Sequence, residues 1–227
     1  NAVADDTETA EPIAAPSDDP APVVSAFSDS MQLSPAHKRA IERHLSAGQT
    51  AIDEGRLDAA RREAQAALKL LKDVGVLPFE GVSALGAQVA LFAGRIEAAA
   101  LRASLTAVED RADGERRRPA LRRQVAVARA AYGRVHSWGV RSFHRCALAE
   151  SAALEAELGR AFADAATRAD NEDDRRWLIK AAVASLRDAR TGFATALRVP
   201  AETTLCFDEA RDGGAAVRRD LGRLGGS

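Results

Sequence analysis

Aromatic residues make up only 4% of this 227-residue chain, although 46% of its residues are hydrophobic. Alanine dominates the apolar content, so the core must be built from small side chains that let neighbouring helices approach closely. Strands are not expected, because alanine is depleted from sheets and alternating runs of Val, Ile, Tyr and Thr are absent. The composition therefore predicts an all-α protein.

The sequence also lacks the short motifs of common enzymes. It contains no G-x-S-x-G, no P-loop, no dinucleotide-binding glycine pattern and no H-E-x-x-H. We therefore expect a non-catalytic protein that requires no cofactor. A run of about 18 uncharged apolar residues is missing too, so no membrane span is expected.

Basic residues are missing from the first 30 positions, which carry seven acidic residues: Asp5, Asp6, Glu8, Glu11, Asp18, Asp19 and Asp29. The rest of the chain has an excess of basic residues, and only four of the 32 basic residues are lysine. Arginine favours planar contacts with carboxylates and phosphates, although a GC-rich genome would produce the same bias without any functional meaning. Of these two explanations, we favour genome composition.

The N-terminal residues 1–33 are rich in Pro, Asp, Ser, Thr and Ala and contain few large apolar groups, which predicts a disordered tail. The chain opens at Asn1, and Ala2-Val3-Ala4 has the small-x-small form of a signal-peptidase site, with Asp5 as the first residue after cleavage. We expect a protein exported to the periplasm or secreted, with a truncated cytoplasmic chain as the alternative.

Glycines, prolines and capping residues divide the remainder into helices. Ser34 as a cap and Pro35 at the first helical position predict where the first helix begins. The expected helices cover about residues 34–55, 57–71, 82–92, 96–108, 119–169 with a break near Gly133 or Gly139, and 171–199. Residues 34–110 would form helical hairpins and residues 119–200 a long-helix bundle segment packed on them. A charged connection is expected at 109–119, and a weakly ordered segment at 201–227.

A six-residue phrase occurs twice, as Gly55-Arg56-Leu57-Asp58-Ala59-Ala60 and, 39 residues later, as Gly94-Arg95-Ile96-Glu97-Ala98-Ala99. Each copy lies between alanine-rich helical stretches, which is typical of stacked helical hairpins that turn at Gly55 and Gly94. About residues 42–108 resemble a degenerate tetratricopeptide repeat. The matching positions are Gly48, Ala51, Gly55, Leu57, Ala60 and Ala67, and then Ala87, Ala90, Gly94, Ile96 and Ala99, whereas Thr106 departs from the pattern.

The resemblance implies stacked hairpins whose groove binds peptide segments of a partner. In such stacks the first helix of each unit lines the groove. The partner-binding residues expected on this basis are Arg43, Gln49, Thr50 and Asp53 in the first unit and Gln88 and Phe92 in the second.

An alternative binding surface lies in the arginine-rich region between Arg111 and Arg134. Its central residues are Arg116, Arg117, Arg118, Arg122 and Arg123. This region could contact nucleic acid or another polyanion. Acidic residues lie within it and no aromatic residue precedes Tyr132, so we expect a solvated face or a surface for an acidic protein instead.

Histidines and cysteines are few. His37 and His44 lie two helical turns apart, too far to share one metal ion, whereas His136, His144, Cys146 and Glu150 do not share one helical face. No metal site is expected. Cys146 and Cys206 are the only cysteines. In an exported protein they are expected to form a disulfide, whereas in a cytoplasmic protein they would be buried thiols.

Taken together, these features favour a non-catalytic helical scaffold that binds a protein or peptide in the bacterial cell envelope. The alternative is a polyanion-binding helical protein that uses the region from Arg111 to Arg134. A metal-dependent helical-bundle enzyme is a third, more distant possibility.

Overall fold

A computed structural model of the chain describes residues 33–105, 111–200 and 203–225, with side chains in the second range given from residue 114. The described residues form seven α-helices and one 3-10 helix, without any strand, so the predicted all-α class is confirmed. Residues 1–32 of the predicted tail, with the cleavage site, fall outside these residues, whereas its last residue, Leu33, is buried in the core. The helices are α2 (Pro35–Asp53), α3 (Leu57–Asp73), α4 (Ala84–Leu105), α5 (Arg111–Gly133), η1 (Arg134–Trp138), α6 (Arg141–Thr167), α7 (Glu172–Arg198) and α8 (Phe207–Gly225).

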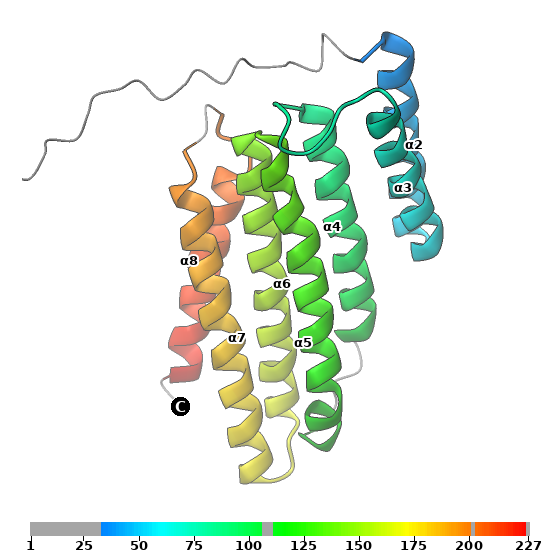
Figure 1. The fold of residues 1–227 in the computed structure, drawn as a ribbon. Coiled ribbons are helices and arrows are strands. Elements are labelled where there is room, and N and C mark those ends of the chain that lie inside the picture. Colours follow the sequence, from blue (N-terminus) through cyan, green and yellow to red (C-terminus); the bar gives the residue numbers. More distant parts are fainter. Residues whose placement is uncertain (1–32, 106–110, 201–202, 226–227) are drawn as a thin grey trace, which may run out of the picture.

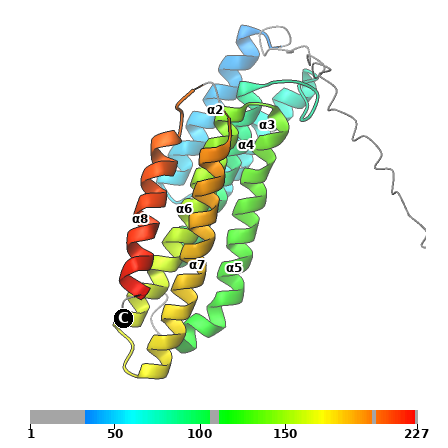
Figure 2. The same cartoon turned by 90° about the vertical axis from the view of Figure 1, so that its left-hand side faces the viewer.

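Each helix packs against the next one in the chain, and the long helices α4, α5, α6 and α7 run side by side (Figure 1). α8 covers α6 and α7 at one side of this bundle, and the α2–α3 hairpin packs on α4 at the other side (Figure 2). α4 therefore lies between α3 and α5. Alanines form much of the buried core, as the composition predicts.

The α2–α3 hairpin follows the sequence prediction. The Ser34 hydroxyl accepts a hydrogen bond from the backbone N–H of His37, and Pro35 occupies the first turn. The turn at Gly55 has φ of +72°, a left-handed conformation that glycine adopts without strain. One buried stripe on α3 consists of Ala60, Ala64, Ala67 and Leu71. The predicted first hairpin and its turn are confirmed.

The predicted turn at Gly94 is wrong, because α4 runs without interruption through the second copy of the phrase. Gly94 lies on the helix face that meets α5, and a Cβ atom added there would stand 2.4 Å from the Tyr132 ring. This glycine makes room for an aromatic ring instead of bending the backbone. Two helices predicted at 82–92 and 96–108 are thus one helix, and the second hairpin does not form.

We expect Gly94→Leu to lower the free energy of unfolding by about 1–3 kcal/mol, because the added side chain would displace the buried Tyr132 ring. Gly133→Ala is the matched control, since nothing lies within 4 Å of a Cβ added at that α5 glycine. Urea denaturation measures the free energy of unfolding of both variants. A Gly94→Leu protein as stable as the wild type would contradict the close approach.

The second half differs from prediction at both ends. The connection expected at 109–119 is helical from Arg111 onward, and Pro119 lies inside α5. Gly114 is buried close to Trp177, so tertiary packing holds this charged stretch in the helix. The break predicted near Gly133 or Gly139 is confirmed: α5 ends at Gly133, η1 follows, and Gly139 caps η1.

The C-terminal segment expected to be weakly ordered instead contains α8. Its glycine pair does not end the helix, because Gly213 lies directly against the Phe193 ring of α7, where a Cβ atom would clash at 2.5 Å. Ala210 and Val217 are buried on the same packed face. Glycines that suggest a break in the sequence serve here as a close contact between helices.

Two arginines of α4 form ion pairs with two glutamates of α6. Arg95 contacts Glu150 with its Nη2 atom 2.6 Å from Oε1, and Arg102 contacts Glu157 with Nε 2.8 Å from Oε2. Tyr132 of α5 donates its hydroxyl to Glu150 at 3.0 Å. Burial, followed by the charge of Glu150, raises the pKa of this tyrosine, which therefore remains a donor at neutral pH.

α4 is the one described helix that is long and apolar enough to cross a membrane by length and composition alone. It is also the helix that packs against α2, α3, α5 and α6, and ten of its residues are buried there. A central bundle helix has this composition for reasons of packing.

Candidate functional site

The groove residues predicted on α2 are exposed, but they bind mainly to their own helix. Gln49 donates its side-chain amide to Asp53 at 2.9 Å, and the Thr50 hydroxyl donates to the Ser46 carbonyl at 3.2 Å. Arg43, in the N-terminal half of the same helix, is exposed to solvent. Arg43 lines a hollow whose described lining, Ala36, Arg39, Glu42, Arg43 and Ser46, belongs to α2 alone, so the described residues supply no second wall of a groove there.

The two residues predicted on the second unit do not join them. Phe92 is buried, with its ring against Gly48 of α2 and within a small core that includes Ala60 and Ile96, so its assignment as a partner-binding residue is wrong. Gln88 is half-buried. Because the turn at Gly94 is absent, α4 presents a core face toward α2 where the repeat would present a groove.

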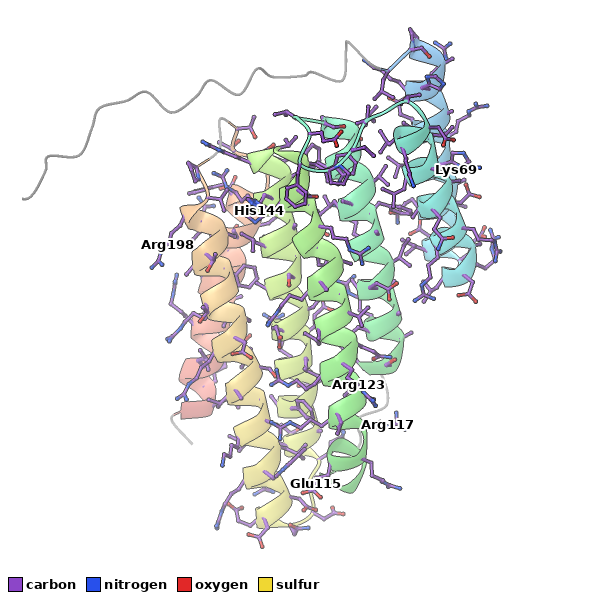
Figure 3. The ribbon with its side chains drawn as sticks, viewed as in Figure 1. Lys69, Glu115, Arg117, Arg123, His144 and Arg198 are labelled. Atoms are coloured by element: carbon purple, nitrogen blue, oxygen red, sulfur yellow. A yellow bond between two sulfur atoms is a disulfide. The ribbon has the colours of Figure 1, made fainter. Side chains whose placement is uncertain are left out.

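The predicted basic surface on α5 is divided. Arg116, Arg117 and Arg123 are exposed, and Figure 3 shows Arg117 and Arg123 on the outer side of α5. Arg118 instead lies over the Trp177 ring at 5.7 Å, and Arg122 points inward. The five arginines therefore do not form one continuous phosphate-binding face.

Arg122 belongs to a partly exposed cluster around the buried Glu155 of α6, which is 1% exposed, whereas the side chains of Arg129 and Asp188 are more than half exposed. The Nη1 atom of Arg122 lies 3.4 Å from a carboxylate oxygen of Glu155 and 3.4 Å from one of Asp188. The Nη2 atom of Arg122 donates to the Ser185 hydroxyl at 3.1 Å. Arg129 donates to the other Glu155 oxygen at 2.7 Å. Burial raises the pKa of Glu155, and the two arginines oppose this rise. The members of this cluster satisfy one another, which indicates a role in holding α5, α6 and α7 together.

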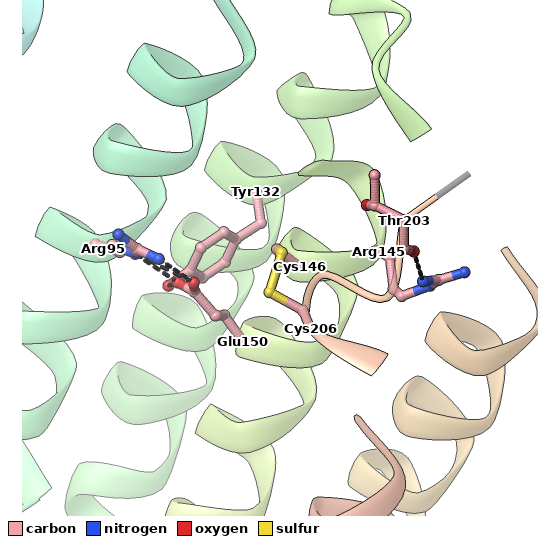
Figure 4. The surroundings of a disulfide bond; sticks show 7 residues. All are labelled: Arg95, Tyr132, Arg145, Cys146, Glu150, Thr203 and Cys206. Atoms are coloured by element: carbon pink, nitrogen blue, oxygen red, sulfur yellow. Dashed lines mark hydrogen bonds and ion pairs between the residues drawn. A yellow bond between two sulfur atoms is a disulfide. The ribbon is translucent and has the colours of Figure 1, made fainter. Parts of the chain in front are cut away.

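The predicted disulfide between Cys146 and Cys206 is confirmed, with 5.1 Å between the Cα atoms (Figure 4). Beside it, the buried Arg145 donates at 2.8 Å to the carbonyls of Val199 and Thr203. Arginine at a helix C-terminus satisfies carbonyls that lack partners within the helix. Together these bonds fix the connection between α7 and α8 to α6.

The structure brings His136 and His144 together, with 4.8 Å between ring centroids, a proximity that the sequence spacing does not indicate. The described residues contain no group of three possible ligands, and Cys146 is oxidised. Burial, followed by the charge of His136, lowers the pKa of His144. We interpret the His136–His144 pair as a structural packing contact.

This lowered pKa predicts a pH effect on stability. The folded state binds a proton at His144 less readily than the unfolded state, whose pKa is near 6.5, so stability should fall as the pH drops below 6.5. We expect His144→Gln to flatten the dependence of the melting temperature on pH between 7.5 and 5. His136→Gln should flatten it less, because burial is the larger cause. Equal slopes in the wild type and His144→Gln would contradict this assignment.

The most distinctive surface feature is an apolar groove, which we call the Phe79 groove. α4 forms its floor through Ala90 and Ala93, α3 forms one wall, and α5 with η1 forms the other. A hollow of about 370 Å³ is lined by Leu68, Pro78, Phe79, Ala90, Ala93, Ala131, Arg134, Ser137 and Trp138. A second hollow of about 180 Å³ is lined by Arg61, Ala64, Gln65, Leu68, Ala93, Ile96, Glu97, Ala131 and Arg134. The four shared residues make the two hollows one continuous groove.

Phe79 stands at the rim of this groove with 83% of its surface exposed, the highest value among the large hydrophobic residues described as exposed. Its φ of +66° is unusual for a bulky residue, and its backbone N–H donates to the Ser137 carbonyl at 2.7 Å. The Ser83 N–H donates to the Trp138 carbonyl at 3.1 Å, so two backbone bonds hold this loop on η1. The loop thus presents an aromatic ring to solvent, and a left-handed backbone at a non-glycine residue costs on the order of 1–3 kcal/mol.

The sequence contains a signal for this site that pattern analysis missed. Phe79 is one of only seven phenylalanines, and it lies in the short loop Pro78-Phe79-Glu80-Gly81, where an aromatic residue has no helix face to join. An aromatic residue in a proline–glycine loop favours a surface role.

Comparison of the chain with protein-family models, curated proteins and solved structures finds no match. The functional argument therefore depends on the geometry of the groove.

Proposed function

We propose that this protein is a non-catalytic helical scaffold that binds a segment of a partner protein in the Phe79 groove. The observation that carries this proposal is Phe79 itself, an aromatic side chain held in solvent beside a largely apolar groove. Aromatic residues at the centre of an interface commonly dominate its binding energy. An exposed ring with a strained backbone gives no benefit to the isolated monomer, whereas a bound partner would cover it.

The shape of the groove supports a peptide segment as the occupant. Its floor consists of alanines, so the main chain or a helix of a partner can approach α4 closely. Its walls offer the larger apolar side chains of Leu68 and Trp138. A helix or extended segment laid into such a groove is a common mode of peptide recognition.

We further propose that this binding takes place in the bacterial cell envelope, in the periplasm or outside the cell. The disulfide supports an oxidising compartment. The polyanion-binding alternative receives less support, because Arg118 and Arg122 are engaged with Trp177 and the Glu155 cluster.

The test is affinity capture from the native cell envelope with the 227-residue chain, followed by mass spectrometry and direct binding of the purified partner. We expect Phe79→Ser to weaken binding about thirtyfold or more, which corresponds to the loss of one interface hot spot of about 2 kcal/mol. Its melting temperature should stay close to that of the wild type, because the ring is exposed.

Leu205→Ser is the matched control, since Leu205 is another exposed large hydrophobic residue, 46% exposed, in the connection between α7 and α8. It should bind like the wild type, as should a variant with Ala at Arg43 and Gln88. Binding that survives Phe79→Ser but is lost in the Arg43 and Gln88 variant would refute the groove and restore the surface expected from the repeat.

A further inference from the structure

We infer that the Phe79 groove selects an acidic partner segment, in which a bulky apolar side chain fills the larger hollow and a nearby carboxylate pairs with Arg134. This inference rests on the proposed function and specifies the chemistry of the occupant. It follows from which charges in the groove are already paired.

Three charged residues line the two hollows: Arg61, Glu97 and Arg134. Arg61 and Glu97 neutralise each other, since both the Nε and Nη2 atoms of the arginine donate to the glutamate, at 3.0 and 3.2 Å. Arg61 also donates to Asp58 at 3.0 Å. On the α3 side of the groove, the charges of Arg61 and Glu97 are therefore already paired and are not available to a charged ligand.

Arg134 differs from this pair. It is exposed, and among residues 33–105, 114–200 and 203–225 it has no ion-pair partner. It lines both hollows, so a segment that spans the groove must pass its guanidinium. A planar guanidinium binds a carboxylate through two parallel hydrogen bonds, which gives both affinity and orientation.

Among the described residues, no neighbouring carboxylate offers a cationic ligand an unpaired partner inside the groove, as Arg134 does for an anionic one. Glu97 is already engaged by Arg61, and Glu80 follows Phe79 on the loop but lines neither hollow. Lys72 lies one turn beyond Leu68 on the same face of α3 and adds positive charge at that end. The unpaired charge of the groove is thus positive, and a basic segment would meet repulsion.

The apolar part of the site has room for a large side chain. The hollow of about 370 Å³ is bounded by Leu68, Pro78, Phe79 and Trp138. A Leu, Phe or Trp side chain placed there would cover the exposed face of Phe79, and aromatic pairs of this kind add to the area buried. The occupant therefore combines one apolar anchor with acidic residues next to it.

The experiment is selection of a random twelve-residue peptide library against the 227-residue chain, followed by fluorescence anisotropy with the selected peptides. We expect the peptides whose binding depends on Phe79 to pair an aromatic or large aliphatic residue with Asp or Glu. Replacing those acids by Asn or Gln should weaken binding at least tenfold. The Arg134→Glu variant should show the same loss, and it should prefer a peptide in which Lys replaces the acids.

Arg123→Glu is the matched control, because it makes the same charge change at another exposed arginine, eleven residues earlier and three turns away. It should leave peptide binding within twofold of the wild type. Selected peptides that are neutral or basic, or an Arg134→Glu variant with unchanged affinity, would overturn the inference while leaving the proposed function intact. A library without any peptide dependent on Phe79 would contradict both.

A further arm uses a synthetic peptide of residues 1–32, which carries seven acidic residues and also Phe27. We expect it not to displace the selected peptides, since the inferred occupant belongs to another protein. Displacement that depends on Arg134 would instead assign the groove to the chain's own N-terminal segment and overturn the inference of a separate partner.

Discussion

Replacing Cys146 and Cys206 by serine should lower the free energy of unfolding by about 4 kcal/mol, the chain-entropy value for a closed loop of this length. The bond joins residues 60 apart and closes a loop that contains most of α6 and all of α7. Without it the unfolded chain gains freedom, and the start of α8 loses its covalent attachment to α6. Urea denaturation under non-reducing conditions measures the difference.

Reduction provides the matched control for this prediction. Adding dithiothreitol to the wild type should reproduce the loss, whereas the double serine variant should not respond to the reductant. A double alanine variant separates the missing bond from the effect of burying hydroxyl groups, since Cys146 is 2% exposed. A reduced wild type that unfolds at the same urea concentration as the oxidised protein would show that the bond contributes no stability.

A loss of about 3 kcal/mol or more is expected when methionine replaces both Arg122 and Arg129. These two residues compensate the carboxylate of Glu155, which is 1% exposed, and breaking a buried pair from one side leaves an isolated charge. Adding Glu155→Leu to the double variant should recover most of the loss, because the buried charge is then removed. A triple variant no more stable than the double variant would contradict this account.

The same cluster predicts a pH dependence with a defined sign. The pKa of Glu155 is raised by burial above its ordinary value of 4.5, and it should rise further without the arginines. Because the folded-state pKa is raised, stability is highest below the unfolded-state pKa and falls as the pH increases from there through the folded-state pKa. The double methionine variant should therefore differ most from the wild type at neutral pH and least near pH 4.5.

Local features of the chain predicted the first hairpin and the disulfide correctly, but they also predicted a second hairpin that does not form. The two copies of the repeated phrase are nearly alike in sequence, yet Gly55 adopts a left-handed turn and Gly94 continues a helix. The difference arises from Tyr132, 38 residues further along the chain, whose ring packs against Gly94. Because that contact is tertiary, the pattern around either glycine could not distinguish the two roles.

The candidate site was missed for a related reason. Leu68, Ala93, Ala131 and Arg134 come from four different elements, α3, α4, α5 and η1, and they share no sequence pattern. The groove forms because α4 separates α3 from α5. Phe79 alone had a local signal. For Arg122 the prediction failed in the opposite way. The run of arginines predicted a solvated surface, but the Arg122 side chain points inward and pairs with Glu155 of α6.

The ion pairs between α4 and α6 have a consequence for how these helices align. Alanine-rich surfaces are smooth, so packing alone would allow one helix to slide along the other with little change in buried area. Arg95 and Arg102 are seven residues apart, and so are their partners Glu150 and Glu157. A slip of one helical turn, about 5.4 Å, would break both pairs at once. The two pairs thus favour one axial register of α4 against α6, in addition to the aromatic rings of Tyr132 and Trp138 that pack on the glycines of α4.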